Sequence, residues 1–216
     1  MRKKLIKTNA PSRRRFLAAF GVAQCLAPRA LRAAPVNYTV PGILAVLRQP
    51  TPHVCWATAA TMMASWKQNS SFQIATVMSQ ADTYTAGEYG FHLMFTQDKD
   101  LAGSLKPDLL DALGLSAEAP MNLTVDGWVS LLKTKGLLWV TTNEGVGSGP
   151  FFSAHARIIS AIAGDGTPNG TFLTFVDPAL GAKSTETITR FVQKFEELAR
   201  QDHGAGADLR PQIAHF

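Results

Sequence analysis

The spacing of hydrophobic and polar positions predicts helices in the first half of the chain and strands in the second. An Ala- and Met-rich stretch without Gly or Pro predicts a helix from Cys55 to about Gln68. Further helices are expected over residues 72–83, 106–113, 124–135 and 188–200. A buried strand is expected over residues 137–142.

A long hairpin follows that strand. It joins His155–Ala163 to Thr171–Val176 through the Gly- and Pro-rich turn of residues 164–170. Helices followed by antiparallel strands indicate an α+β fold. The tail Gln201–Phe216 is rich in Gly, Ala and polar residues, and we expect it to be mobile.

The charge of the chain is concentrated in its first residues. Of the 21 Lys and Arg, nine lie in residues 1–34, which contain no acidic residue. The remaining twelve stand against 16 Asp and Glu, so the rest of the chain carries about −4 although the whole carries +5. The 216 residues, 46% of them hydrophobic, suffice for one globular domain. We therefore expect no nucleic-acid partner. We also expect the protein to be a monomer.

Residues 1–34 have the pattern of a signal peptide. A basic region ending in Ser12-Arg13-Arg14-Arg15-Phe16-Leu17 precedes the apolar run Ala18–Leu26 and the small residues around Ala30–Ala34. This order resembles a twin-arginine export signal of bacteria, and an ordinary secretory signal is the alternative. The apolar run is shorter than the ~20 residues that span a bilayer. We expect cleavage between Ala30 and Pro35, a periplasmic or secreted product, and no stable membrane anchor after cleavage.

Cleavage would remove Cys25 and leave Cys55 as the single cysteine of the mature chain. Acylation of Cys25 in a lipoprotein is disfavoured because Gln24 stands where a small residue is required. A lone cysteine is buried filler, an intermolecular link or a reactive thiol. Cys55 begins a predicted helix, where the backbone N–H groups stabilise a thiolate, so the reactive thiol is favoured.

Three further residues complete a candidate catalytic set. Gln49 lies six residues before Cys55, from where its amide and the Cys55 N–H could both face an oxyanion. His155 begins the first strand of the hairpin and Asp177 ends the second, so both lie at one end of the sheet. The strand register leaves open which faces they occupy.

Other polar residues have simpler explanations. His53 is too close to Cys55 in sequence to be the favoured base, and Asp165 fits its Gly-Asp-Gly turn. His203 and His215 lie in the tail and are expected to be solvated. No Cys pair or His-x-x-x-His spacing indicates a metal, and no cofactor is expected.

The motifs around these residues resemble papain-like cysteine peptidases, in particular the compact bacterial branch that includes type III effector proteases. The resemblance rests on Gln49-Pro-Thr-Pro-His-Val-Cys55-Trp56-Ala57-Thr58-Ala59, on His155-Ala156-Arg157-Ile158-Ile159, and on Gly164-Asp165-Gly166-Thr167 with Val176-Asp177-Pro178. It covers most of residues 44–198. Papain differs in having Gly-Ser before its Cys-Trp and a hydrophobic residue where Arg157 stands.

The resemblance implies a papain-like domain over residues 35–200, with a helical half and a sheet half facing across a cleft. It implies a catalytic triad of Cys55, His155 and Asp177, an oxyanion hole of Gln49 and the Cys55 N–H, and a protein or peptide substrate. Two alternatives stay open: a peptidoglycan amidase or endopeptidase using the same dyad, and a catalytically silent binding module.

Overall fold

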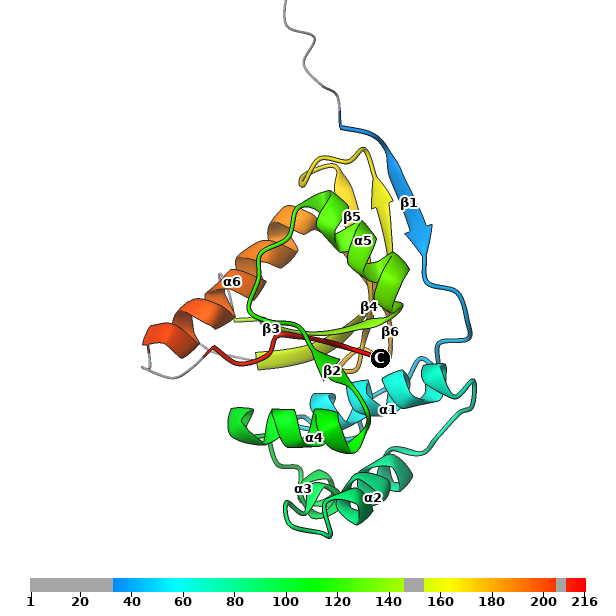
Figure 1. The fold of residues 1–216 in the computed structure, drawn as a ribbon, viewed down its shortest axis with the longest axis vertical. Helices are drawn as coiled ribbons and strands as arrows, with labels where there is room; N and C mark the ends of the chain where they lie inside the picture. Colours follow the sequence, from blue (N-terminus) through cyan, green and yellow to red (C-terminus); the bar gives the residue numbers. More distant parts are fainter. Residues whose placement is uncertain (1–32, 146–153, 205–208) are drawn as a thin grey trace, which may run out of the picture. The chain divides into compact units, whose positions relative to one another are not determined.

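A single antiparallel sheet organises the part of the chain that can be described. The computed structural model describes residues 33–145, 154–204 and 209–216 (Figure 1). The sheet has seven strands in the order β2-β7-β3-β4-β5-β6, with β1 also pairing with β4. The strands are β1 Val36–Thr39, β2 Ser116–Ala117, β3 Leu138–Asn143, β4 Ala154–Gly164, β5 Thr171–Asp177, β6 Ala182–Thr187 and β7 Ile213–His215.

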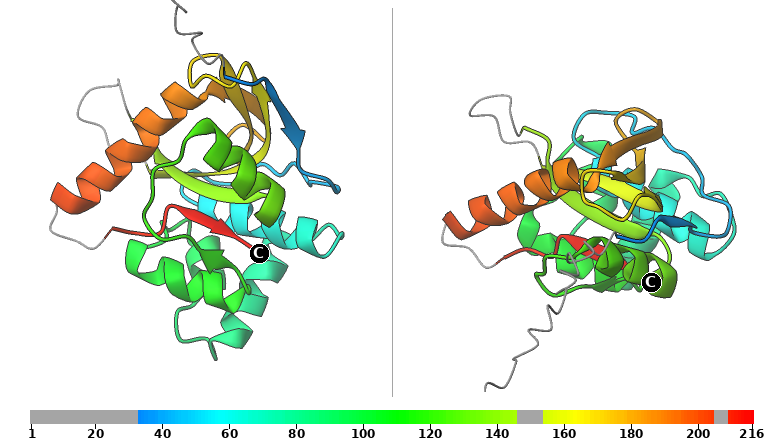
Figure 2. Two further views of the ribbon diagram at one scale, coloured as in Figure 1. Left: turned by 45° about the horizontal axis from the view of Figure 1, so that its top comes forward. Right: turned by 90° about the horizontal axis from the view of Figure 1, so that it is seen from above.

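The helices form two groups on opposite sides of this sheet. Figure 1 and Figure 2 show α1 to α4 together on one side and α5 with α6 on the other. Their bounds are α1 Cys55–Lys67, α2 Ile74–Tyr84, α3 Phe91–Thr96, the 3-10 turn η1 Gly103–Leu105, α4 Lys106–Ala112, α5 Val125–Lys135 and α6 Ile188–Gly204. Helices first and antiparallel strands later confirm the predicted α+β, papain-like fold.

Burial explains the composition of α1. Residues from Trp56 to Ser65 are buried without interruption, so the helix has no solvated face between α2 and the sheet. Small Ala and adaptable Met side chains suit such close packing on all sides. The hydroxyls of Thr58 and Thr61 bond to the carbonyls of Val54 and Ala57 one turn back, so the buried polar groups are satisfied.

The predicted hairpin forms as β4 and β5. Ile158 lies opposite Val176, and a register shift between Ile159 and Ala161 gives β4 one extra residue. The first residues of β4 and the last of β5 consequently lie at the same end of the sheet. This end faces the N-terminus of α1.

The prediction of a mobile tail is wrong for residues 201–204 and 213–215, which lie in a helix and a strand. Helix α6 continues to Gly204, and β7 lies between β2 and β3 with Ile213, Ala214 and His215 buried. The expected solvation of His215 is also wrong, because its Nε2 lies 2.8 Å from Glu118 Oε1. The predicted signal peptide lies almost entirely outside the described residues, as residues 1–32 are not described.

Four charged side chains hold the sheet to α6. Arg157 Nη2 lies 2.9 Å from Glu144 Oε1 and 2.8 Å from Glu186 Oε1. Lys194 Nζ lies 2.7 Å and 2.8 Å from the Oε2 atoms of the same two glutamates. Burial raises the pKa of Glu144, but Arg157 and Lys194 outweigh it and hold the pKa below its ordinary value. Each glutamate thus forms ion pairs with both cations. We call these four residues the charge quartet.

Removing one carboxylate from the charge quartet should destabilise the fold strongly. We expect Glu186→Gln to lower the free energy of unfolding by about 3 kcal/mol, because two largely buried cations would then share one carboxylate. Urea denaturation followed by circular dichroism measures this loss. Glu197→Gln is the matched control, since its partner Arg200 is 67% exposed, and it should change stability by less than about 0.5 kcal/mol. Equal losses in the two variants would contradict a structural role for the quartet.

Candidate active site

Cys55 occupies the first position of α1, where neither a side-chain cap nor an acidic residue offsets the positive end of the helix dipole. The preceding residue, Val54, offers no side-chain cap, and the first turn contains no acidic residue. The open N–H groups and the positive end of the helix dipole therefore favour negative charge at the Cys55 sulfur. Cys55 is partly buried and is a free thiol.

His155 lies between the sulfur and a carboxylate. Its Nε2 is 2.8 Å from Asp177 Oδ1, and its side chain also hydrogen-bonds Cys55. Because Nε2 hydrogen-bonds Asp177, Nδ1 is the ring nitrogen that is left to interact with the Cys55 sulfur. Burial lowers the pKa of His155, but the hydrogen bonds with Asp177 and Cys55 outweigh burial and raise it to about 9. The imidazole is thus held as an imidazolium at neutral pH.

Asp177 is itself fixed by the turn that follows β5. Its Oδ1 accepts the backbone N–H of Ala179 at 2.8 Å. Burial raises the pKa of Asp177, but the hydrogen bond and charge of His155 outweigh it and bring the pKa below its ordinary value. Asp177 is therefore an ionised acceptor, and Nε2 of His155 donates to it.

A contact that the sequence did not predict ties the segment before Cys55 to the turn after Asp177. The backbone N–H of Gln49 donates to the carbonyl of Pro178 at 2.9 Å. Gly181 has φ +61°, and a Cβ at this position would lie 2.5 Å from the Cβ of Arg48. Only glycine accommodates both the left-handed backbone and this close approach. We call these contacts of Arg48, Gln49, Pro178 and Gly181 the backbone clasp.

The side chain of Gln49 folds back onto its own loop. Its Nε2 donates to the carbonyls of Thr51 at 2.9 Å and Pro52 at 2.7 Å, which occupies both amide N–H groups. Its Oε1 is buried and has no partner within the described residues. The structure thus places Gln49 in the loop that leads to Cys55, with its amide engaged in that loop.

A cleft of about 490 Å³ opens between the helical and sheet halves beside these residues. The loop before α1 and the start of α1 contribute Pro52, His53, Cys55 and Trp56, and the start of β4 contributes His155. Side chains of α4, β3 and α6 also line the cleft. The cysteine and the histidine therefore face one space large enough for part of a peptide.

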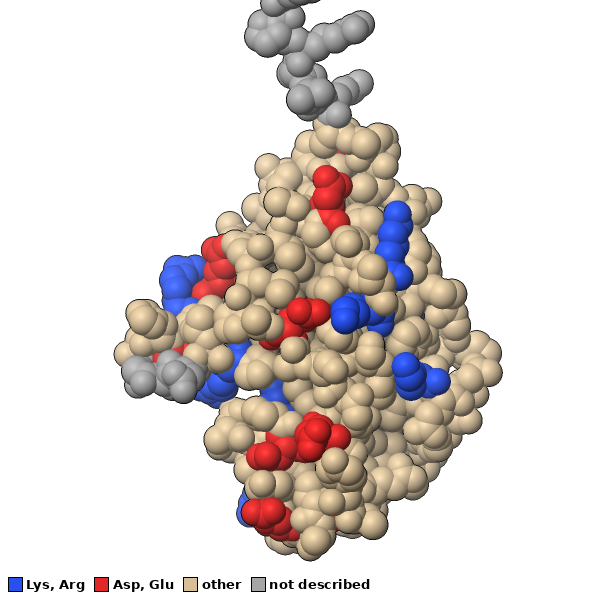
Figure 3. All heavy atoms as spheres, in the orientation of Figure 1, with Lys and Arg blue, Asp and Glu red and all other residues tan. Residues whose placement is uncertain are grey.

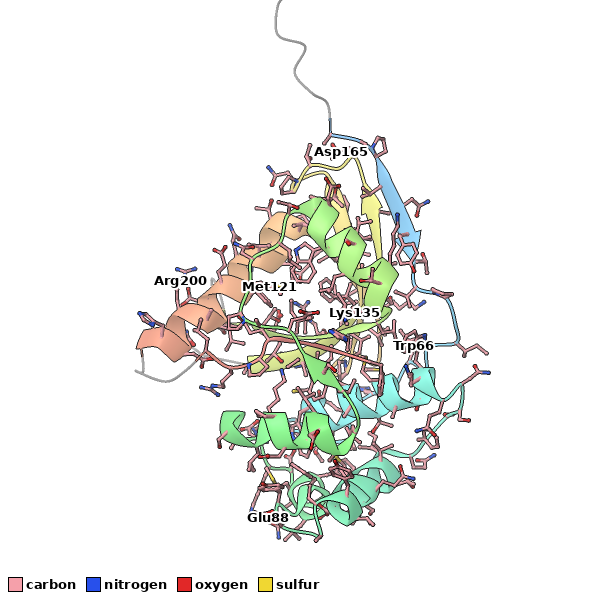
Figure 4. The ribbon with its side chains drawn as sticks, viewed as in Figure 1. Trp66, Glu88, Met121, Lys135, Asp165 and Arg200 are labelled. Atoms are coloured by element: carbon pink, nitrogen blue, oxygen red, sulfur yellow. The ribbon has the colours of Figure 1, made fainter. Side chains whose placement is uncertain are left out.

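The alternative residues have other partners. His53 pairs with Asp98 through Nδ1 at 3.1 Å and through its backbone N–H at 2.9 Å, and the hydrogen bond to Asp98 raises its pKa. Asp165 accepts the N–H and hydroxyl of Thr167 at the tip of the β4–β5 hairpin (Figure 4). No cluster of three or more His, Cys, Asp or Glu suited to a metal occurs in the described part of the chain. Within that same part, no helix has the length and apolar character to cross a membrane.

Cysteine, imidazolium and carboxylate in series at a cleft between a helical half and a sheet half define the papain-like cysteine peptidases. Comparison with protein families agrees, since the model of the papain-like cysteine protease AvrRpt2 family matches residues 35–196. The chain belongs to this family and is a cysteine-type peptidase. No curated protein matches the chain.

Proposed function

We propose that the protein is an exported peptidase that hydrolyses peptide bonds through a triad of Cys55, His155 and Asp177. The observation that carries the proposal is that His155 and Cys55 line one cleft, where Asp177 lies 2.8 Å from His155 and both Asp177 and Cys55 raise the pKa of His155. Membership of a protease family supports a protein or peptide substrate over peptidoglycan.

The proposed mechanism begins with the proton on His155. The Cys55 thiolate attacks the carbonyl carbon of the scissile bond and forms a C–S bond, while the carbonyl oxygen takes up negative charge. His155 then donates its proton to the leaving amine, which departs and leaves a thioester. The neutral imidazole next removes a proton from water, which attacks the thioester and releases the acid and the thiolate. Asp177 orients the ring throughout by accepting from Nε2.

The oxyanion would be stabilised by the Cys55 backbone N–H and the Gln49 amide. The Cys55 N–H lies at the open helix N-terminus, and Gln49 Nε2 would exchange one of its loop carbonyls for the charged oxygen. An oxyanion is a stronger acceptor than a neutral carbonyl, which favours this exchange.

Gln49→Ala distinguishes this role from one in shaping the loop. We expect kcat/KM for peptide hydrolysis to fall about a hundredfold, because one oxyanion donor is lost. Alkylation of Cys55 by iodoacetamide forms no oxyanion, so its rate should stay within about twofold of the wild type. A parallel drop in both rates would mean that Gln49 acts by holding the loop.

Export is proposed from the sequence of the leader. The arginine-rich segment before an apolar run supports a twin-arginine signal, followed by a periplasmic or secreted monomer without a membrane anchor. Mass spectrometry of the protein from the periplasmic fraction of a bacterial host should give a new N-terminus between residues 30 and 35.

Labelling with a thiol-directed epoxide inhibitor tests the proposed function. We expect one equivalent of label on Cys55, found by peptide mapping, and loss of peptidase activity in proportion to labelling. Failure of Cys55 to react faster than a free thiol would contradict the proposed activated thiol and favour a silent binding module.

A further inference from the structure

Among the described residues, one buried lysine that lines the cleft has no carboxylate within ion-pair distance. Lys106, the first residue of α4, is only 6% exposed and lines the cleft together with Cys55 and His155. Throughout the described residues, no Asp or Glu forms an ion pair with Lys106. The other buried cations, Arg157 and Lys194, each bridge two glutamates. Lys106 therefore differs from them in carrying an unbalanced charge.

The surroundings of Lys106 position its ammonium without neutralising it. Nζ donates to Thr141 Oγ1 at 2.8 Å and to the carbonyl of Pro211 at 2.7 Å, and it lies 5.1 Å from the centre of the Trp139 ring. An ammonium has three N–H donors, so one is left for a ligand. Burial lowers the pKa of Lys106 to about 7 and Arg210 also lowers it, while the charges of Cys55 and Asp202 raise it.

Arg210 adds a second cation, which also lines the cleft and acts on Lys106 through its charge. Its side chain crosses the face of Gly103, where a Cβ would lie 2.1 Å from Arg210 Cδ. Arg210 Nη2 lies 2.7 Å from Asp202 Oδ1, so this carboxylate pairs with the guanidinium and acts on the Lys106 ammonium only through its charge. Basic side chains are visible in the recess between the end of α6 and α4 (Figure 3).

Asp100 also lines the cleft. Asp100 acts there on His53, whose pKa it helps to raise. The Cys55 thiolate and the His155 imidazolium balance each other in the proposed mechanism. Among the described residues, Lys106, Arg210 and Asp202 thus keep a surplus of one positive charge when Lys106 is protonated, which one carboxylate would neutralise.

We propose that Lys106 and Arg210 form a subsite that binds a carboxylate of the substrate. This inference rests on the proposed peptidase function, because the subsite shares its cleft with the nucleophile. The carboxylate belongs either to an acidic side chain near the scissile bond or to the free C-terminus of the peptide. In both cases the carboxylate would accept a hydrogen bond from the remaining N–H of Lys106. Its charge would offset the free-energy cost of desolvating the ammonium.

Matched pairs of internally quenched peptides test the subsite. One series replaces Glu by Gln at each position within about four residues of the scissile bond, and a second replaces the C-terminal carboxylate by an amide. We expect kcat/KM to be about tenfold to a hundredfold higher for the acid at one position, since a charged hydrogen bond discriminates by this amount. The series that shows the difference identifies the source of the carboxylate.

Three variants connect this preference to the named residues. Lys106→Met should remove the preference, and Arg210→Gln should reduce it several-fold. Gly103→Ala should also reduce it, because the added Cβ displaces the Arg210 side chain without removing its charge. Arg200→Gln makes the same change of charge on the outer side of α6 (Figure 4) and should leave the ratio unchanged. The ratio of two rates in one preparation is independent of the folded fraction.

Binding without cleavage separates the inference from the proposed function. Fluorescence anisotropy of the same peptides with the Cys55→Ala chain should show the same preference for the acid. If no peptide is cleaved by the wild type, the proposed function fails, and the anisotropy measurement still decides on the subsite. The subsite is refuted if acid and isostere bind alike at every position, or if the preference survives in all three variants.

Discussion

A Cys55→Ala chain should lose peptidase activity entirely while keeping its fold. The alanine methyl group cannot form a thioester, and replacing the nucleophile of a comparable triad lowers kcat by about a millionfold. The side chain is only partly buried at the first position of α1, so the helix and its packing on the sheet need no sulfur. Hydrolysis of a quenched peptide measures the activity, and thermal unfolding by circular dichroism measures the fold.

A matched substitution makes this result specific. Ser65→Ala removes a hydroxyl from the other end of the same helix, where it accepts the N–H of Phe72, and should leave kcat/KM within a few-fold of the wild type. Retained turnover in the Cys55→Ala chain would refute the assigned nucleophile. Equal loss in both variants would point to damage to α1 instead of to the chemistry.

Replacing Asp177 should give the second-largest loss and should move the pH profile. The raised pKa of His155 means that the imidazolium is present below about pH 9 and is lost as the pH rises through that value. The wild type should therefore lose kcat/KM on the alkaline side near pH 9. In Asp177→Ala the carboxylate that favours the imidazolium is absent, so we expect a loss of at least about a hundredfold and an alkaline limb at lower pH.

The asparagine variant separates the charge of Asp177 from its hydrogen bond. Asp177→Asn retains an acceptor for Nε2 of His155 but no negative charge. We expect it to keep more activity than Asp177→Ala, with an alkaline limb that is also displaced to lower pH. A pH profile of kcat/KM from about pH 5 to 10 records both effects. An alkaline limb unchanged in both variants would mean that Asp177 does not set the protonation of His155.

The strongly patterned elements were predictable from the sequence, and the reasons are local. The helix from Cys55 and the hairpin around residues 164–170 depend on composition, periodicity and turn residues that lie within the elements themselves. The chain order of Gln49, Cys55, His155 and Asp177 was enough to name the candidate site, and the structure brings the last three together.

What could not be predicted depends on contacts between distant segments. Strand β7 has three residues and no recognisable alternation, and it is a strand because β2 and β3 flank it. Lys106 looked like any charged residue of a short helix, and only packing against Trp139 and Pro211 shows that it is buried in the cleft. The side chain of Gln49 bonds to its own loop, which spacing from Cys55 did not indicate.

The backbone clasp has a consequence for how the family can diverge. Its hydrogen bond joins the main-chain N–H of residue 49 to the main-chain carbonyl of residue 178, and almost any amino acid supplies these groups. Side chains there can drift through evolution without altering the separation between nucleophile and acid. The exception is Gly181, where any β-carbon would collide with Arg48 and push the two loops apart. In a distant homologue, a glycine four residues after the acid would indicate this architecture even where the neighbouring residues differ.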